Sequence, residues 1–235
     1  MIIDTPTKVE ELIVPGQGFG LGPISNGTQK FRDYCHQNFA KDVAPDGAEN
    51  IYLSRSALGG LEGGAILEER IEANLINSGY DIIHPQKHTI AQQVAMFKAA
   101  KRVVGLDGSA FHLFGFVANN TQRAAIILRR NSSVFNGLKN QIEKFAGIKT
   151  DIVSTVVADW IPKHKNRPGR YSFGELDQSD LSDQLKTAGY ISANAEWDVP
   201  RFREMKQAMI KFGAEKGTEY RRTKKSGRSA KQAQS

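Results

Sequence analysis

Polar residues gather in the stretch from Arg102 to Phe116, RVVGLDGSAFHLFGF, where a short apolar strand gives way to a helix. Gly108 lets the chain turn without a Cβ in the way, so the amides of Ser109 and Ala110 can point at an anion. A helix N-terminus also presents free N–H groups and about half a positive charge. These residue types, with Asp107 beside them, predict a phosphate-binding turn.

Two further loops of similar composition follow predicted strands, one at residues 54–64 and one at 129–133. Ligands of doubly wound sheets bind at the carboxyl ends of the strands, so we expect all three loops to lie on one edge. An arginine would add a bidentate, charge-assisted contact to a phosphate bound there. The loops offer the cations Arg55, Arg129 and Arg130, the glycines Gly59, Gly60, Gly63, Gly64, Gly105 and Gly108, and the hydroxyls of Ser54, Ser56, Ser109, Ser132 and Ser133.

The same residues also have a purely structural interpretation. Glycine and serine are common in turns between strands and helices, and Asp107 is a suitable cap for the helix that follows. Glu68 and Glu69 lie at the start of another predicted helix, where negative charge is favourable without any function. The functional alternative is a carboxylate that accepts hydrogen bonds from ribose hydroxyls. Three such loops on one edge favour a binding site.

Histidines supply the remaining candidates for chemistry. His112 lies on a mostly apolar helix, so it is either a hydrogen-bonded core residue or, through its closeness to Asp107 and the glycine turn, part of the site. His84 and His88 are four residues apart without a third ligand to complete a metal-binding pattern, and we predict no metal site. No loop matches G-x-x-x-x-G-K-S/T, which argues against a P-loop ATPase or GTPase. None reads G-x-G-x-x-G, the dinucleotide-binding pattern, directly after a strand.

The composition is that of a globular protein of one domain or one and a half. The chain has 235 residues, of which 40% are apolar and 24% are charged, and this length is ample for a buried core. No run of about 18 apolar residues is present, so no transmembrane helix is expected. The N-terminus has acids where a signal peptide needs lysines, which predicts a cytoplasmic protein. The single cysteine, Cys35, excludes an internal disulfide.

Charge is unevenly distributed along the chain. Residues 201–235 carry a net charge of +8, whereas the rest of the chain carries −1. A nearly neutral body argues against a specific nucleic-acid-binding domain, whose basic stripe would lie on the folded face. We expect the basic tail at 217–235 to be disordered, and either solvated or in peripheral contact with the anionic inner face of the membrane, at about 1 kcal/mol per basic residue.

Strands and helices alternate along most of the chain. The predicted strands are short and nearly continuous in apolar residues, which is typical of strands buried on both faces. The expected fold class is therefore α/β, a doubly wound parallel sheet with helices on both sides. The predicted strands are 9–14, 51–54, 80–85, 102–106, 123–128 and 151–160, and the predicted helices are 28–40, 65–79, 89–100, 109–118, 133–147, 180–190 and 198–216.

Several motifs, taken in order, resemble the family-61 glycosyltransferases, the group that includes bacterial capsular-polysaccharide transferases. They are IYLSRS (51–56), a helix carrying Glu68, the run GYDIIHPQKHTIAQQVAMFKAAKRVVGLDGSAFHLFGF (79–116) and AAIILRR (124–130). The resemblance covers about residues 50–130. Ser54 and Arg55 match the end of the family's strand, Glu68 its acidic position, Gln92 or Gln93 its glutamine, and Gly105, Gly108, Ser109 and Ala110 its glycine turn.

The chain departs from the family's pattern at three positions. Leu67 replaces an asparagine beside the acidic residue, and Gly64 stands where an upstream arginine is expected. Asp107 replaces the histidine of the glycine turn, so no role for this side chain is carried over from the family.

The resemblance implies a two-domain transferase of the GT-B type, of which this chain resembles the Rossmann-like C-terminal half that holds a nucleotide-sugar. The segment at 1–49 would lead into a nucleotide-sugar-binding core at 50–160, followed by a helical extension at 161–216, and a partner could supply an acceptor domain. Such enzymes usually need no metal ion, because basic side chains and a helix N-terminus stabilise the leaving diphosphate. They need no cofactor either, because the nucleotide-sugar is a substrate. The residues implied in donor binding are Ser54, Arg55, Glu68, Gly105, Gly108, Ser109, Ala110 and Arg129.

Three classes of function remain open. The leading hypothesis is transfer of a sugar from a nucleotide-sugar to a polysaccharide or other glycan acceptor, with Arg55 on the phosphate, Glu68 on the ribose, and Asp107 or His112 close enough to the sugar for proton transfer. The second is a non-catalytic module that binds a nucleotide-sugar or partners a complete transferase. The third is salt-sensitive association of the basic tail with nucleic acid.

Overall fold

A five-stranded sheet forms the centre of the fold. The computed structural model describes residues 4–14, 16–20, 22–58 and 62–223. The strands of this sheet are all parallel, in the order β3-β1-β4-β5-β6. Val103, Val104 and Ile126 in its middle strands are fully buried, as expected for strands covered on both faces. The strands are β1 (Asn50–Leu53), β3 (Asp81–Ile83), β4 (Arg102–Leu106), β5 (Arg123–Ile127) and β6 (Thr150–Val153).

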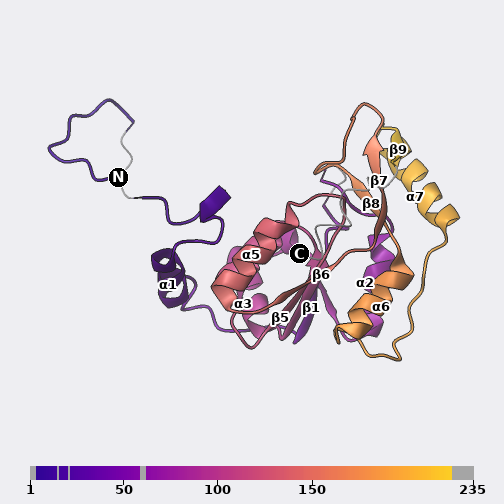
Figure 1. The fold of residues 1–235 in the computed structure, drawn as a ribbon, viewed down its shortest axis with the longest axis horizontal. Coiled ribbons are helices and arrows are strands. Elements are labelled where there is room, and N and C mark those ends of the chain that lie inside the picture. The colour runs from indigo at the N-terminus through magenta and orange to yellow at the C-terminus, as the bar shows by residue number, and fades with distance from the viewer. Residues whose placement is uncertain (1–3, 15, 21, 59–61, 224–235) are drawn as a thin grey trace.

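Helices cover both faces of this sheet, which confirms the predicted Rossmann-like α/β fold. Helices α3 and α5 lie on one side and α2 and α6 on the other (Figure 1), and α4 packs against both α3 and α5. The chain steps from β1 to β3 in one direction and from β4 to β6 in the other, so the strand order reverses between β1 and β4. The helices are α1 (Gln29–Asn38), α2 (Glu68–Asn77), α3 (Ile90–Ala99), α4 (Ala110–Val117), α5 (Phe135–Ala146), α6 (Gln178–Thr187) and α7 (Phe202–Glu215).

Local capping signals set several helix boundaries. At the start of α3 the Thr89 side chain accepts a hydrogen bond from the Gln92 N–H at 3.2 Å, and the Gln92 side chain accepts one from the Thr89 N–H at 2.8 Å. This capping box satisfies two backbone donors at once. Gly147 ends α5 with φ +69°, the left-handed conformation that favours glycine.

Helix α1 attaches to the body through an aromatic cluster. Phe19 and Phe31 meet Phe116 of α4 and Phe145 of α5, with ring centroids 5.2 to 6.3 Å apart. The strand predicted at 9–14 is wrong, because no strand forms there and its apolar side chains are exposed. A strand needs a neighbouring edge for its backbone hydrogen bonds, and the described residues place none beside this segment.

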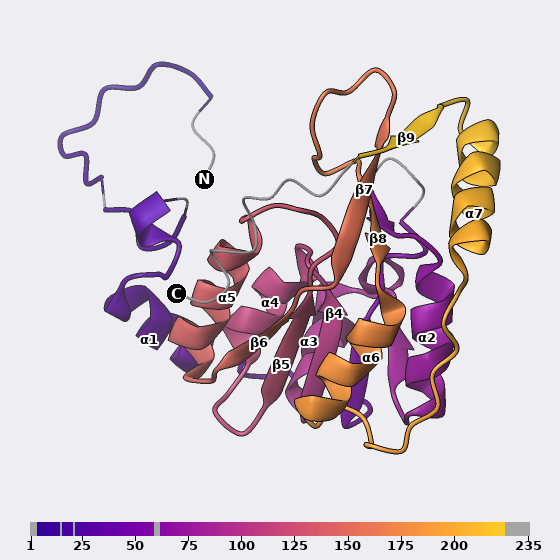
Figure 2. The ribbon, with the colours of Figure 1, turned by 45° about the vertical axis from the view of Figure 1, so that its right-hand side comes forward.

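A second, four-stranded sheet stands at the carboxyl end of the first one (Figure 2). Its order is β2-β8-β7-β9, with β2 and β8 parallel and the other pairs antiparallel. Helix α7 packs on it through Met205 and Met209, which contact Ile66 and Trp160 in a small separate core. The strands are β2 (Gly64–Ala65), β7 (Val156–Pro162), β8 (Phe173–Leu176) and β9 (Tyr220–Arg222).

This sheet corrects four predictions made from sequence. The strand predicted at 151–160 is two strands, β6 and β7, because the chain leaves the first sheet at residues 154–155 and enters the second. Residues 64–65 form β2, so the helix predicted from residue 65 begins at Glu68. Residues 173–176 pair as β8, in a part of the chain where the sequence predicts no strand.

The fourth correction concerns the start of the basic tail. Residues 220–222 form β9 instead of being disordered, because Arg222 donates two hydrogen bonds to the buried Glu175 carboxylate, at 2.6 and 2.7 Å. The rest of the predicted tail, 224–235, lies outside the described residues. None of the helices in the described ranges has both the length and the apolar character needed to cross a membrane.

Candidate functional site

Arg55 lies at the meeting point of the loops that follow β1 and β4, at the reversal of strand order. Its side chain borders three cavities, of about 150, 330 and 360 Å³. A Cβ at Gly108 would lie 2.8 Å from the Arg55 Nη1 atom. Glycine is therefore what allows the guanidinium to lie against the turn after β4.

The Arg55 guanidinium is only partly satisfied by the protein. Its Nη2 donates to the carbonyl oxygen of Glu62 at 2.9 Å, while the buried Nε has no hydrogen-bond partner among the described residues. Burial lowers the pKa of Arg55, against the opposing attraction of Glu68 and Asp107. A buried donor without a hydrogen-bond partner lowers the stability of the fold, so this guanidinium is suited to bind an anionic ligand.

Asp107 holds the loop after β5 in place. Its Oδ1 accepts the Arg129 N–H at 3.0 Å, and the Arg129 Nε donates to the Asp107 carbonyl oxygen at 2.9 Å. The Arg130 Nε lies 3.6 Å from the Asp107 Oδ2. Asp107 and Arg129 are each 4% exposed. Both carboxylate oxygens thus face arginines, and the alternative in which Asp107 caps α4 is wrong, because α4 has no side-chain cap.

The charges of this cluster shift one another's proton affinities. Burial raises the pKa of Asp107 above its usual range, and Arg129 and Arg130 oppose that rise. Burial also lowers the pKa of Arg129 to about 10, which leaves it a cation at neutral pH. Arg55, Arg129 and Arg130 all border the 330 Å³ cavity together with two carboxylates, the buried Asp107 and the exposed Glu62. One positive charge is left in excess, so the cavity attracts anions.

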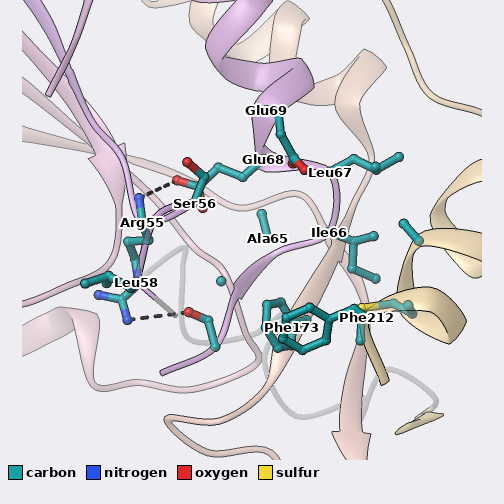
Figure 3. Close-up of a pocket in the computed structure, with 14 residues that line it drawn as sticks. Arg55, Ser56, Leu58, Ala65, Ile66, Leu67, Glu68, Glu69, Phe173 and Phe212 are labelled. Carbon is teal, nitrogen blue, oxygen red and sulfur yellow. Dashed lines mark hydrogen bonds between the residues drawn. The ribbon is translucent and has the colours of Figure 1, made fainter. Parts of the chain in front are cut away.

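Glu68 ties β1, its loop and α2 together. Its carboxylate accepts the Arg55 N–H at 2.8 Å and the Tyr52 O–H at 3.1 Å, and Figure 3 shows it on the wall of the 150 Å³ cavity. Glu68 is 2% exposed, and burial raises its pKa to about 7. The predicted position at the start of α2 is confirmed, whereas the neighbouring Glu69 is exposed.

His112 lies on the exposed rim of the 330 Å³ cavity, held by a residue that sequence reasoning missed. The Gln141 Nε2 donates to the His112 carbonyl oxygen at 3.0 Å, and the Gln141 Oε1 contacts the His112 Nδ1. Gln141 is 1% exposed. Its signal in the sequence is a polar residue on the apolar face of α5, beside Leu138, Ile142 and Phe145.

The other predicted site residues divide between loop contacts and the cavity rim. A Cβ at Gly105 would lie 2.8 Å from the Leu53 Cβ, so this glycine permits close packing of β1 and β4. The Ser54 hydroxyl donates to Glu72 at 2.5 Å. Ser109 is exposed on the cavity rim, and the N–H groups of Ser109 and Ala110 have no partner in the described chain. Gly59 and Gly60 lie outside the described residues.

The glutamines and histidines before β4 build the neighbouring turn. The Gln93 Nε2 donates to the carbonyl oxygens of Pro85 and His88, at 2.9 and 3.0 Å. Gln92 takes part in the capping box of α3. Across the part of the chain that the structure describes, no three His, Cys, Asp or Glu side chains are grouped to hold a metal ion.

Comparison with known proteins adds one match to this geometry. A family model described as Glycosyltransferase 61 matches residues 1–124, while a search of curated proteins found no match. The matched part contains β1, α2, β4 and α4 with Arg55, Glu68 and Asp107. Arg129, Gln141 and the strands β7, β8 and β9 lie beyond it.

Proposed function

The chain belongs to the glycosyltransferase 61 family, and from this premise we propose that it transfers a sugar from a nucleotide-sugar donor to a glycan acceptor. The observation that carries the proposal is the set of three arginines, Arg55, Arg129 and Arg130, around the buried carboxylate of Asp107. Their excess positive charge suits a diphosphate, the group that leaves when the sugar is transferred.

In this proposal Arg55 and the free amides at the start of α4 bind the diphosphate. They balance its growing negative charge with protein cations in place of a metal ion, as in the GT-B type. Glu68 contacts the ribose from the wall of the adjoining cavity. Asp107 is a positioning residue, because its oxygens are engaged with Arg129 and Arg130.

We propose His112 as the base that accepts the proton of the acceptor hydroxyl. Because the Gln141 amide nitrogen donates to the His112 carbonyl oxygen, its oxygen is the atom that faces Nδ1. Nδ1 therefore carries the proton in the neutral ring, and Nε2 is left as the acceptor of a residue that lines the cavity.

A screen for thermal stabilisation tests the proposed function. UDP-, GDP-, CMP- and dTDP-sugars are added to the purified chain, and one class should raise the Tm by about 5 to 10 °C at a hundredfold excess over its Kd. Arg55→Ala should remove most of this rise, because it removes the central cation. An unchanged rise would remove Arg55 from the site, and stabilisation without turnover on any acceptor would favour the non-catalytic module.

Changing Gln141 tests the proposed base. Gln141→Leu should lower kcat about tenfold with an unchanged KM for the donor, because the ring loses its fixed tautomer and orientation. The ¹⁵N chemical shifts of His112 should show mixed tautomers in the variant and a single Nδ1–H form in the parent. Asn140→Ala, on the exposed side of α5, is the matched control. Mixed tautomers already present in the parent would contradict the assignment.

A further inference from the structure

Helix α7 carries apolar and basic side chains on the face that points away from the protein. Figure 2 shows α7 and β9 at the outer edge of the molecule. Residues spaced four apart on α7 form one exposed row along the helix, which we call the outer row. It consists of Phe202, Lys206, Ile210 and Ala214. The opposite face of α7 already packs on the second sheet, so the outer row is not needed for the core of the protein.

The outer row leads into an apolar cavity of about 480 Å³. Ile210 and Ala214 border this cavity from α7, and Trp160 and Tyr220 border it from the second sheet. Its volume falls within the range of about 300 to 1,000 Å³ found for small-molecule sites, so it can admit a segment of apolar chain. Ile210 is 59% exposed and Phe202 is 50% exposed. Two large apolar side chains beside an apolar cavity indicate a binding surface.

Cations flank the outer row and the cavity. The exposed ones on α7 are Arg203, Lys206 and Lys211, and none of them forms an ion pair within the described residues. Two acids lie nearby, Glu215, which is exposed, and Glu219, which pairs with Lys163 at 2.5 Å. The segment 201–223 contains seven Lys or Arg and three Glu. The surface around α7 is therefore positive and attracts anionic partners.

We propose that the outer row of α7 and the 480 Å³ cavity dock the protein on an anionic lipid bilayer. Apolar side chains enter the boundary between headgroups and acyl chains, and cations beside them contact anionic headgroups. A small anion would occupy the cations alone, and an apolar ligand would occupy the cavity alone, whereas a bilayer occupies both.

This docking surface differs from the basic tail. The segment 224–235 contains Lys and Arg but no Val, Leu, Ile, Met or aromatic residue, so it offers a membrane charge without an apolar anchor. The outer row offers both, from a folded helix. It also adjoins the candidate site, because Met209 borders both the 480 Å³ and the 150 Å³ cavities.

Flotation of the full chain with vesicles tests the proposal. The vesicles contain either phosphatidylcholine alone or phosphatidylcholine with one-third phosphatidylglycerol. Binding to the anionic vesicles should be at least about tenfold tighter, because each cation near an anionic surface contributes about fivefold. Ile210→Ser should weaken this binding about tenfold, because the side chain that enters the bilayer becomes polar.

Ile76→Ser is the matched control for Ile210→Ser. Ile76 is 56% exposed and lies near the end of α2, just before β3 begins. The amino end of the five-stranded sheet is there, whereas the second sheet and α7 stand at its carboxyl end (Figure 2). Ile76→Ser should therefore leave vesicle binding unchanged.

Trp160 gives a direct readout of the cavity. The chain has two tryptophans, so Trp197→Phe leaves Trp160 as the single fluorophore. Its emission should fall when the phosphatidylcholine of the anionic vesicles carries bromine on its acyl chains. Ile210→Ser should remove most of this loss at the same lipid concentration.

The outcomes separate the bilayer from other occupants. Absence of binding to anionic vesicles overturns the proposal, as does equal binding to neutral ones. Binding that Ile210→Ser does not weaken would place the contact in the basic tail, and bound chain without loss of Trp160 emission would place it away from the cavity; either result overturns the proposal. Stabilisation by a nucleotide-sugar is measured without lipid, so these failures leave the proposed function standing.

Discussion

Replacing Arg129 by methionine is expected to lower the free energy of unfolding by about 3 to 5 kcal/mol, the range found when one partner of a buried ion pair is removed. Asp107 is 4% exposed and would lose its nearest cation, the group that opposes the rise of its pKa on burial. Methionine preserves most of the side-chain volume, so the loss reports the charge and not a cavity. Urea unfolding at pH 7 measures it.

Two further variants identify the cause of this loss. The double variant Asp107→Asn with Arg129→Met should recover part of the stability, because no buried charge is then left unpaired. Arg130→Met is the matched control, since Arg130 is 12% exposed and its Nε lies farther from Asp107, at 3.6 Å, and its loss should be clearly smaller. A loss below about 1 kcal/mol for Arg129→Met would show that the pair does not stabilise the fold.

The position of the site follows from the sequence, but its internal pairing does not. Glycine-rich loops after short apolar runs predict the edge where Arg55 and Gly108 meet. The partnership of Asp107 with Arg129 depends on the pairing of β4 with β5, in which Leu106 lies opposite Ile127. Strand order and register are long-range properties, and a single sequence contains no local signal for either.

The second sheet was missed for a related reason. Strand β2 has only two residues, and β8 is preceded by a polar loop, so neither gives a recognisable periodic pattern. Gly174 is a sequence signal for close packing of β8, because a Cβ on this residue would lie 2.2 Å from the Arg129 carbonyl oxygen. The glycine thus allows β8 to approach the loop that carries the arginines. A single glycine in a strand indicates close approach without naming the neighbour.

Leu67 shows how a departure from the family pattern fits the same backbone. It precedes α2 in the left-handed conformation, with φ 54° and ψ 45°, which asparagine adopts far more readily than leucine. The family resemblance expects asparagine at this position. The chain therefore retains the left-handed turn before Glu68, and the backbone of Leu67 is strained as a result.

Glu68 should make the stability of the protein fall as the pH rises towards neutrality. Burial raises its pKa to about 7 in the folded chain, from 4.5 as the reference for the unfolded chain. Below pH 4.5 both states are protonated, and between these two values the folded state holds the extra proton. Stability is therefore lost as the pH rises through this window and levels off above about pH 7. The shift corresponds to roughly 3 kcal/mol.

Glu68→Gln isolates this effect, because glutamine resembles the protonated acid at every pH. The variant should gain stability relative to the parent by roughly 3 kcal/mol between pH 4.5 and pH 8, measured by urea unfolding across that range. Glu69→Gln is the matched control, since Glu69 lies in the same first turn of α2 and is exposed. A difference between Glu68→Gln and the parent that does not change with pH would mean that Glu68 titrates normally.

A carboxyl that is half protonated near pH 7 both donates and accepts hydrogen bonds, which are the two contacts that ribose hydroxyls offer.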